Sequence, residues 1–101
     1  MHADQMETVF EEVDPQIIYG TRPFLTAERL KGIRRKGSKE FPQLIETEAT
    51  YYCIDGHHKV RRAIDNGLPS ILCEVAHTKC TILEDALIKI CSDLIGKLII
   101  K

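Results

Sequence analysis

The chain has 101 residues, 44% of them hydrophobic, with 14 Lys and Arg against 15 Asp and Glu and a formal net charge of −1. A domain of this size buries roughly 60 to 68% of the surface that its unfolded chain exposes, so one hydrophobic core is expected. The balanced charge excludes a bulk polycation. Any affinity for phosphate or nucleic acid must therefore come from the local arrangement of charges.

The cysteines and the apolar segments indicate a cytoplasmic protein with reduced thiols. The sequence contains no CxxC pair, and its first ten residues, MHADQMETVF, lack the apolar segment of a signal peptide. Three of the four cysteines lie in apolar stretches and are expected to be buried. They are Cys53, Cys73, Cys80 and Cys91. The most apolar tract, residues 86–100, includes charged residues and is too short for the ~20 apolar residues of a membrane-spanning helix.

The first half of the chain predicts short elements joined by turns. TVFEEV, residues 8–13, suits a half-buried strand, and the residue before Pro15 is pushed out of the helical region. Residues 17–24 are expected to be extended or loop. Thr26 is then expected to cap a helix that stops at Gly37.

Residues 43–46 and 50–54 are expected to form two strands. A helix should follow, with Asp55 as its N-cap and Gly67 and Pro69 ending it. Its apolar stripe consists of Val60, Ala63 and Ile64.

SILCEVA, residues 70–76, predicts a further buried strand. Strand, helix and strand over 50–75 would then form a right-handed crossover, and in open α/β sheets ligands bind beyond the carboxyl ends of the strands. Residues 83–95 predict an amphipathic helix. The ending GKLIIK is compatible with a frayed helix or an added strand.

Basic side chains crowd the expected start of the central helix at 55–62. They are His57, His58, Lys59, Arg61 and Arg62. Each cation near a helix start costs on the order of 0.3 to 1 kcal/mol, whereas a bound phosphate would make these interactions favourable. Gly56 would let such a ligand approach the free amide groups of the first turn. The turn therefore predicts a phosphate site.

A structural interpretation of the same turn stays open. Lys59, Arg61 and Arg62 can form an ordinary solvated face that Asp55 partly neutralises. His57 lies near the edge of the apolar stripe, so it can equally be a half-buried structural histidine.

From about residue 9 to 75 the chain resembles the ParB/sulfiredoxin superfamily, in particular its ParB-like N-terminal domain. TRPFLTAERLKGIRRKG (21–37) is similar to that domain's early arginine and first helix, and FPQLI (41–45) to its following turn into a strand. YYCIDGHHKVRRA (51–63) is similar to its phosphate-binding box, although His57 replaces the glutamate of the box, and His58 and Lys59 replace two of its arginines. The resemblance implies an α+β fold over residues 1–101, a single domain with a small mixed sheet flanked by helices. The nucleotide-binding residues that it implies are Arg22, Gly56, His57, His58, Lys59 and Arg61.

Three groups within the superfamily imply different activities. Sulfiredoxins carry a catalytic cysteine where this chain has His57, which argues against reduction of sulfinic acids. Chromosome-partition proteins continue into a helix-turn-helix domain, but only 25 residues follow Ala76. The archaeal-type free serine kinases have an Asp-Gly-His-His-Arg turn that DGHHK matches except at Lys59. They also use a glutamate near the first strand as a base, and Glu11 and Glu12 stand in a similar place.

Two functions follow as expectations. The first is a phosphotransferase that uses ATP, ADP or CTP, with or without Mg²⁺, on a small hydroxyl-bearing substrate. Asp55 would be its metal ligand or base, and Glu11 or Glu12 the reserve base. The second is a non-catalytic module that binds a nucleotide or the backbone of DNA, to which the basic residues of 31–39 would add positive charge.

Two other features give weaker expectations. Cys73, His77 and Cys80 have the spacing of part of a zinc site, but no fourth ligand is evident, and no metal site is predicted. The apolar C-terminal segment predicts either packing across the sheet or a homodimer.

Overall fold

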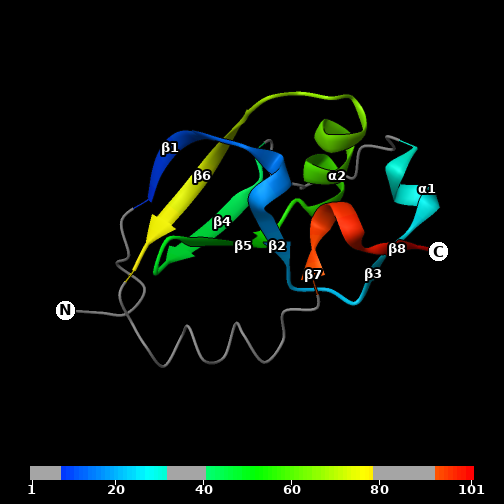
Figure 1. Cartoon of the computed structure of the whole chain (residues 1–101), viewed down its shortest axis with the longest axis horizontal. Coiled ribbons are helices and arrows are strands. Elements are labelled where there is room, and N and C mark those ends of the chain that lie inside the picture. Colours follow the sequence, from blue (N-terminus) through cyan, green and yellow to red (C-terminus); the bar gives the residue numbers. More distant parts are fainter. Residues whose placement is uncertain (1–7, 32–40, 79–92) are drawn as a thin grey trace.

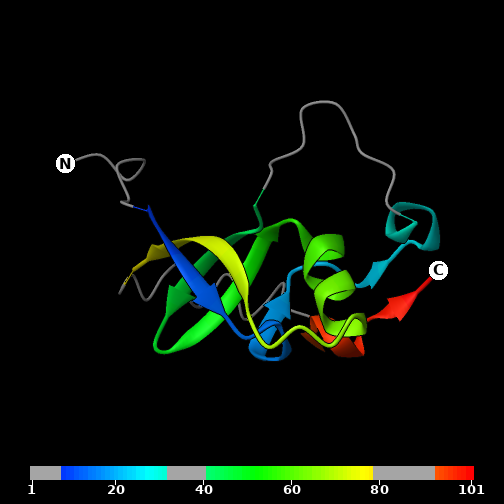
Figure 2. The ribbon, with the colours of Figure 1, turned by 90° about the horizontal axis from the view of Figure 1, so that it is seen from above.

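The computed structural model describes residues 8–31, 41–78 and 93–101. Its elements form a six-stranded mixed sheet with helix α2 on one face and a two-stranded sheet beside it (Figures 1 and 2). The strands are β1 (Thr8–Val13), β2 (Ile18–Gly20), β3 (Phe24–Leu25), β4 (Gln43–Thr47), β5 (Thr50–Asp55), β6 (Ile71–His77), β7 (Asp93–Leu94) and β8 (Ile99–Ile100). The helices are α1 (Ala27–Leu30), α2 (His57–Asp65) and the 3₁₀ turns η2 (Pro15–Ile17) and η3 (Ile95–Lys97). The predicted α+β class is confirmed.

The large sheet has the strand order β1-β6-β4-β5-β2-β7, which contradicts the predicted crossover. β4 is antiparallel to β5 and parallel to β6, so β5 and β6 run in opposite directions with β4 between them. β4 and β5 are joined by a tight turn in which Glu48 and Ala49 both have positive φ (50° and 64°). Such two-residue turns join antiparallel neighbours. Helix α2 then returns the chain to the other edge of β4.

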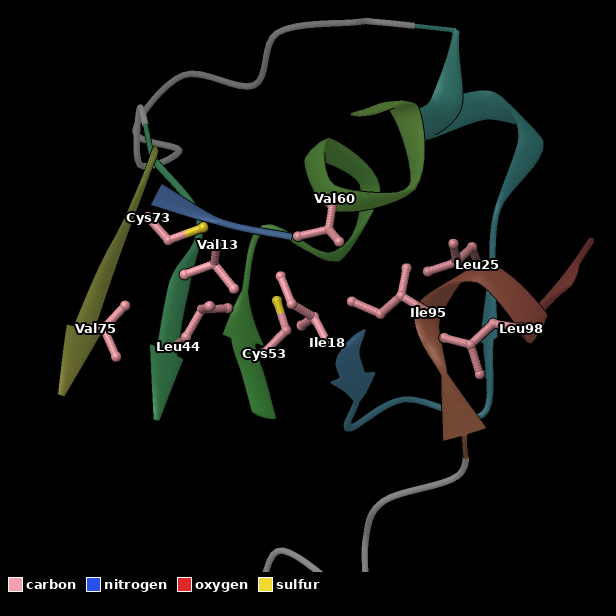
Figure 3. Close-up of a cluster of buried hydrophobic side chains, with 10 residues drawn as sticks. All are labelled: Val13, Ile18, Leu25, Leu44, Cys53, Val60, Cys73, Val75, Ile95 and Leu98. Carbon is pink, nitrogen blue, oxygen red and sulfur yellow. The ribbon is translucent and has the colours of Figure 1, made fainter. Parts of the chain in front are cut away.

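Helix α2 closes the main core against one face of the sheet (Figure 3). The predicted stripe is confirmed, because Val60 and Ala63 are buried and Ile64 packs against the core. Each aliphatic side chain buried in this way contributes about 1.5 to 3 kcal/mol relative to exposure. The main core consists of Val13, Ile18, Leu25, Leu44, Cys53, Val60, Cys73, Val75, Ile95 and Leu98.

The predicted end of α2 is confirmed, but its predicted N-cap is wrong. The N–H of Gly67 donates to Ile64 and that of Leu68 donates to Ala63, and Gly67 has a φ of 70°, which together form a Schellman cap. At the other end the N-cap is Gly56, not Asp55, and no side chain caps the helix. Asp55 remains the last residue of β5, so its side chain does not reach the first turn as a cap.

The described C-terminal residues differ from the helix predicted at 83–95. Asp93–Leu94 forms a strand antiparallel to β2, and Ile95–Lys97 forms a 3₁₀ turn whose Ile95 is fully buried. β8 pairs in parallel with β3, so the ending is an added strand. Figure 2 shows this segment running beside α2 towards β3. The remainder of that predicted helix lies outside the described residues.

Other predictions have mixed outcomes. Thr26 is the N-cap of α1, although its side chain makes no capping hydrogen bond, and the predicted end at Gly37 lies outside the described residues. Cys53 and Cys73 are buried free thiols, as expected. Cys80 and Cys91 are not among the described residues. In the part of the chain that the structure describes, no helix is both long and apolar enough to cross a membrane.

Candidate functional site

The predicted site lies where β5 passes into α2. Gly56 forms the joint with a φ of 95°, a left-handed conformation that other residues adopt at a cost of roughly 1 to 2 kcal/mol. A Cβ at this position would also come within 2.8 Å of the Cα of Pro42. The carbonyl of Gly56 accepts the first helical hydrogen bond, from Val60. The amide N–H groups of the first turn have no acceptor inside the helix, and no acidic residue lies in that turn.

His57 is a buried structural histidine. Its side chain is 4% exposed, and its Nε2 accepts a hydrogen bond of 3.0 Å from the backbone N–H of Thr21. Burial lowers the pKa of His57 to about 4, and the positive charge of Arg22 adds to this effect. Of the two interpretations that the sequence left open, the structure favours the structural one for this side chain.

His58, predicted as a nucleotide-binding residue, also accepts a backbone hydrogen bond. It is partly buried, and its Nε2 accepts a hydrogen bond of 3.1 Å from the backbone N–H of Thr26. Burial lowers the pKa of His58, followed by the charges of Arg29 and Arg22. The pKa of each histidine of the turn therefore lies below 6.5, so the neutral imidazole predominates at pH 7.

The guanidinium of Arg61 points towards the C-terminal segment. Its Nη1 donates to the carbonyls of Ile95 (3.1 Å) and Leu98 (2.9 Å), and its Nε lies 3.3 Å from a carboxylate oxygen of Asp65. These contacts assign Arg61 to the packing of η3 against α2. Lys59, by contrast, lies in the first turn of α2 and is partly buried.

Arg22 and Arg29 add positive charge at this site to that of Lys59. Arg22 follows β2 and is exposed, and Arg29 lies on α1. Both lower the pKa of His57 and of His58, so both charges lie close to the start of α2. The sequence pointed to Arg22 but missed Arg29. The feature of the sequence that could have identified Arg29 is its position on the short helix α1, soon after Arg22.

Glu11 and Glu12 are not brought to the start of α2. They lie on β1, which β6 and β4 separate from β5. Glu12 accepts a hydrogen bond of 2.7 Å from the hydroxyl of Ser70, beyond the C-terminal end of α2. Glu11 contacts His77 at the end of β6. Of the three acidic candidates, Asp55 alone adjoins the glycine of the turn, and its side chain is exposed.

The described residues contain no group of three or more His, Cys, Asp or Glu that could hold a metal ion. His77 forms hydrogen bonds to two glutamates, and burial raises the pKa of Cys73 to about 12. Neither is arranged as a zinc ligand. Cys80, the third residue of that pattern, lies outside the described residues.

No protein-family model matches the sequence, and no curated protein matches it. Several solved structures share its fold, and two of them illustrate the similarity. Protein Atu1540 from Agrobacterium tumefaciens aligns with a TM-score of 0.59 and 13% identity over 82% of this chain and 48% of its own. Sulfiredoxin from Arabidopsis thaliana aligns with a TM-score of 0.52 and 22% identity over 78% of this chain and 97% of its own. This chain spans about half the length of Atu1540. These alignments confirm the fold that was expected from the sequence, a small α+β domain like that of sulfiredoxin.

Proposed function

We propose that the start of α2 binds the phosphate groups of a nucleoside di- or triphosphate (ATP, ADP or CTP), as the phosphate box of a ParB-like domain would. One observation carries the proposal: a helix start whose first-turn amide groups have no acceptor inside the helix, and whose first turn has no acidic residue, lies close to the two cations Arg22 and Arg29. Cations at a helix N-terminus are unfavourable by themselves, and a phosphate anion offsets both the dipole and the cations.

The activity that we propose for this site is transfer of the terminal phosphoryl group to a small hydroxyl-bearing substrate. Such a reaction requires mainly positioning and positive charge around the phosphoryl oxygens. Asp55 is the candidate acceptor of the hydroxyl proton. It is also the candidate carboxylate for Mg²⁺, which proteins commonly bind with one or two carboxylates together with phosphates and water. Chemistry at sulfur is not supported at the described thiols, because burial raises the pKa of both Cys53 and Cys73.

The binding step is tested by thermal unfolding with ADP, ATP and CTP, each with and without Mg²⁺. At about 100 times its Kd, a ligand adds roughly 2.7 kcal/mol of stability. For a domain of this size that raises Tm by ~10 °C or more. Arg22→Ala should lose most of this shift, whereas Arg62→Ala, a matched charge removal on the exposed side of α2, should keep it. Equal shifts in both variants, or none in the parent protein, would overturn the proposal.

Salt dependence separates a nucleotide site from a module that binds the backbone of DNA, the second function considered. A protein that neutralises several phosphates of DNA loses affinity steeply with salt, by a slope of about −0.9 per phosphate contact in a double-logarithmic plot. The nucleotide proposal expects a shallow slope and a preference among the three nucleotides. A steep slope with generic DNA, and no preference, would favour the second function.

A further inference from the structure

Two consecutive histidines hold both ends of one six-residue segment. His57 accepts a hydrogen bond from the backbone N–H of Thr21, and His58 accepts one from the backbone N–H of Thr26. Between these ends lies Arg22, one of the two cations near the start of α2. The hydroxyl of Thr21 also donates to the carbonyl of Cys53 at 2.8 Å, so this end of the segment is fixed to β5 as well.

These hydrogen bonds determine where each imidazole carries its proton. A ring nitrogen that accepts from a backbone N–H must offer a lone pair, so Nε2 of each histidine is unprotonated and the proton lies on Nδ1. A histidine that gained a second proton would lose this acceptor and release Thr21 or Thr26. The imidazoles therefore contribute hydrogen-bond geometry at the start of α2, and the arginines contribute charge.

We propose that His57 and His58 are positioning residues that fasten segment 21–26 to the start of α2 and so place Arg22 beside the amide groups of the first turn. This inference rests on the proposed function in one respect, because the purpose that it gives to the position of Arg22 is to bind a phosphate anion. The attachment itself exists without any ligand. It assigns to the histidine pair a task that differs from direct contact with phosphate.

The first test needs no ligand. Long-range ¹⁵N–¹H NMR correlations of the imidazole rings report which nitrogen carries the proton, and the inference expects the Nδ1–H form of both residues at pH 7. In His58→Ala the amide hydrogen of Thr26 should exchange at least tenfold faster than in the parent protein. His58→Gln, whose side-chain oxygen can accept the same bond, should restore most of the protection. An Nε2–H form of His58, or unchanged exchange in His58→Ala, would overturn the inference.

The second test uses ADP as the probe in calorimetric titrations of the full chain. His58→Ala should weaken ADP binding about tenfold and His58→Gln less than threefold. If His58 acts through Arg22, the same alanine change should have little effect in an Arg22→Ala background. Full additivity of the two changes would overturn the positioning role. If the parent protein does not bind ADP at all, the proposed function loses its support, while the tautomers and the exchange of Thr26 still decide whether the attachment exists.

Discussion

At the scale of single residues, Asp55 shows how the structure decides between two roles that the sequence left open. The sequence indicated that Asp55 is either the N-cap of the helix or a metal ligand or base. Because Gly56 is the N-cap and no side chain caps the helix, the capping role is removed. The exposed carboxylate at the end of β5 lies next to the turn that is proposed to bind phosphate.

Asp55→Asn should therefore leave stability nearly unchanged and reduce activity. No capping hydrogen bond is lost, so we expect the melting temperature to stay within a few degrees of the parent protein. Any phosphotransfer should fall at least tenfold, because the amide can neither accept the substrate proton nor bind Mg²⁺ well. Phosphate binding should stay the same or tighten as a negative charge disappears. Full activity in a phosphotransfer assay would remove Asp55 from the mechanism.

His77 is a second residue whose surroundings the sequence did not predict. It lies between Glu11 on β1 and Glu46 on β4 and forms hydrogen bonds to both carboxylates. These bonds raise the pKa of His77, and the bond from His77 lowers the pKa of Glu46. Tyr51 on β5 faces the same cluster, and its pKa is raised by burial and then by the two glutamates.

Stability should depend on pH through this cluster. A pKa raised by folding gives stability that is fully present below the unfolded value of 6.5 and is lost as the pH rises through the folded value. The lowered pKa of Glu46 affects stability at acidic pH instead. Its contribution to the free energy of unfolding is present above pH 4.5 and is lost as the pH falls below that value. Urea unfolding at a series of pH values should thus show the free energy of unfolding falling above about pH 6.5. His77→Gln should flatten this fall, and an unchanged profile would contradict the assignment.

At the scale of elements, the C-terminal segment forms hydrogen bonds with both parts of the chain around the candidate site, β3 and α1 on the one hand and α2 on the other. The backbone of β8 and Lys101 pairs with β3 and with Ala27 of α1, and Arg61 of α2 donates to the carbonyls of Ile95 and Leu98. Segment 93–101 therefore joins α2, which begins at the proposed phosphate site, to α1, which carries Arg29.

Arg61→Ala should lower stability and leave phosphate binding in place. The change removes the Arg61 donor from the partly buried carbonyl of Leu98, which costs about 1 to 3 kcal/mol, whereas the carbonyl of Ile95 still accepts from the N–H of Leu98. Urea unfolding should show a lower midpoint for Arg61→Ala than for Arg62→Ala, whose side chain is exposed. Below the unfolding transition we expect the affinity for ADP to change less than threefold. A loss of affinity as large as that of Arg22→Ala would instead make Arg61 a phosphate ligand, as the resemblance implied.

Local signals predicted the elements well, because their causes lie within a few residues. Gly67 and Pro69 define the end of α2, and the apolar runs at 50–54 and 70–76 define two strands. The turn after β4 was harder to interpret, since Glu48 and Ala49 adopt positive φ without the glycine that usually marks such a turn. Without a glycine in this turn, the sequence did not show that β4 and β5 form an antiparallel hairpin.

At the scale of the whole molecule, the site depends on contacts between residues that are far apart in the sequence. Thr21 and His57 are 36 residues apart, Thr26 and His58 are 32 apart, and Arg61 and Leu98 are 37 apart. The sequence predicted the turn, its glycine and Arg22. It could not show that both histidines accept backbone hydrogen bonds, that Arg61 turns away, or that Arg29 approaches. These properties depend on the order of the strands in the sheet. The crossover that the sequence predicted over 50–75 does not match that order.

The central claim is that the amide groups at the start of α2 hold the phosphates of a nucleotide. Its most direct test is a titration of the ¹⁵N-labelled protein with ADP and Mg²⁺, followed through the backbone amide signals. We predict that the signals of Gly56, His57, His58 and Lys59 shift most, together with that of Arg22, while those of Glu11 and Glu12 on β1 stay in place. Saturable shifts centred on β1, or no shifts at millimolar ADP, would contradict the claim.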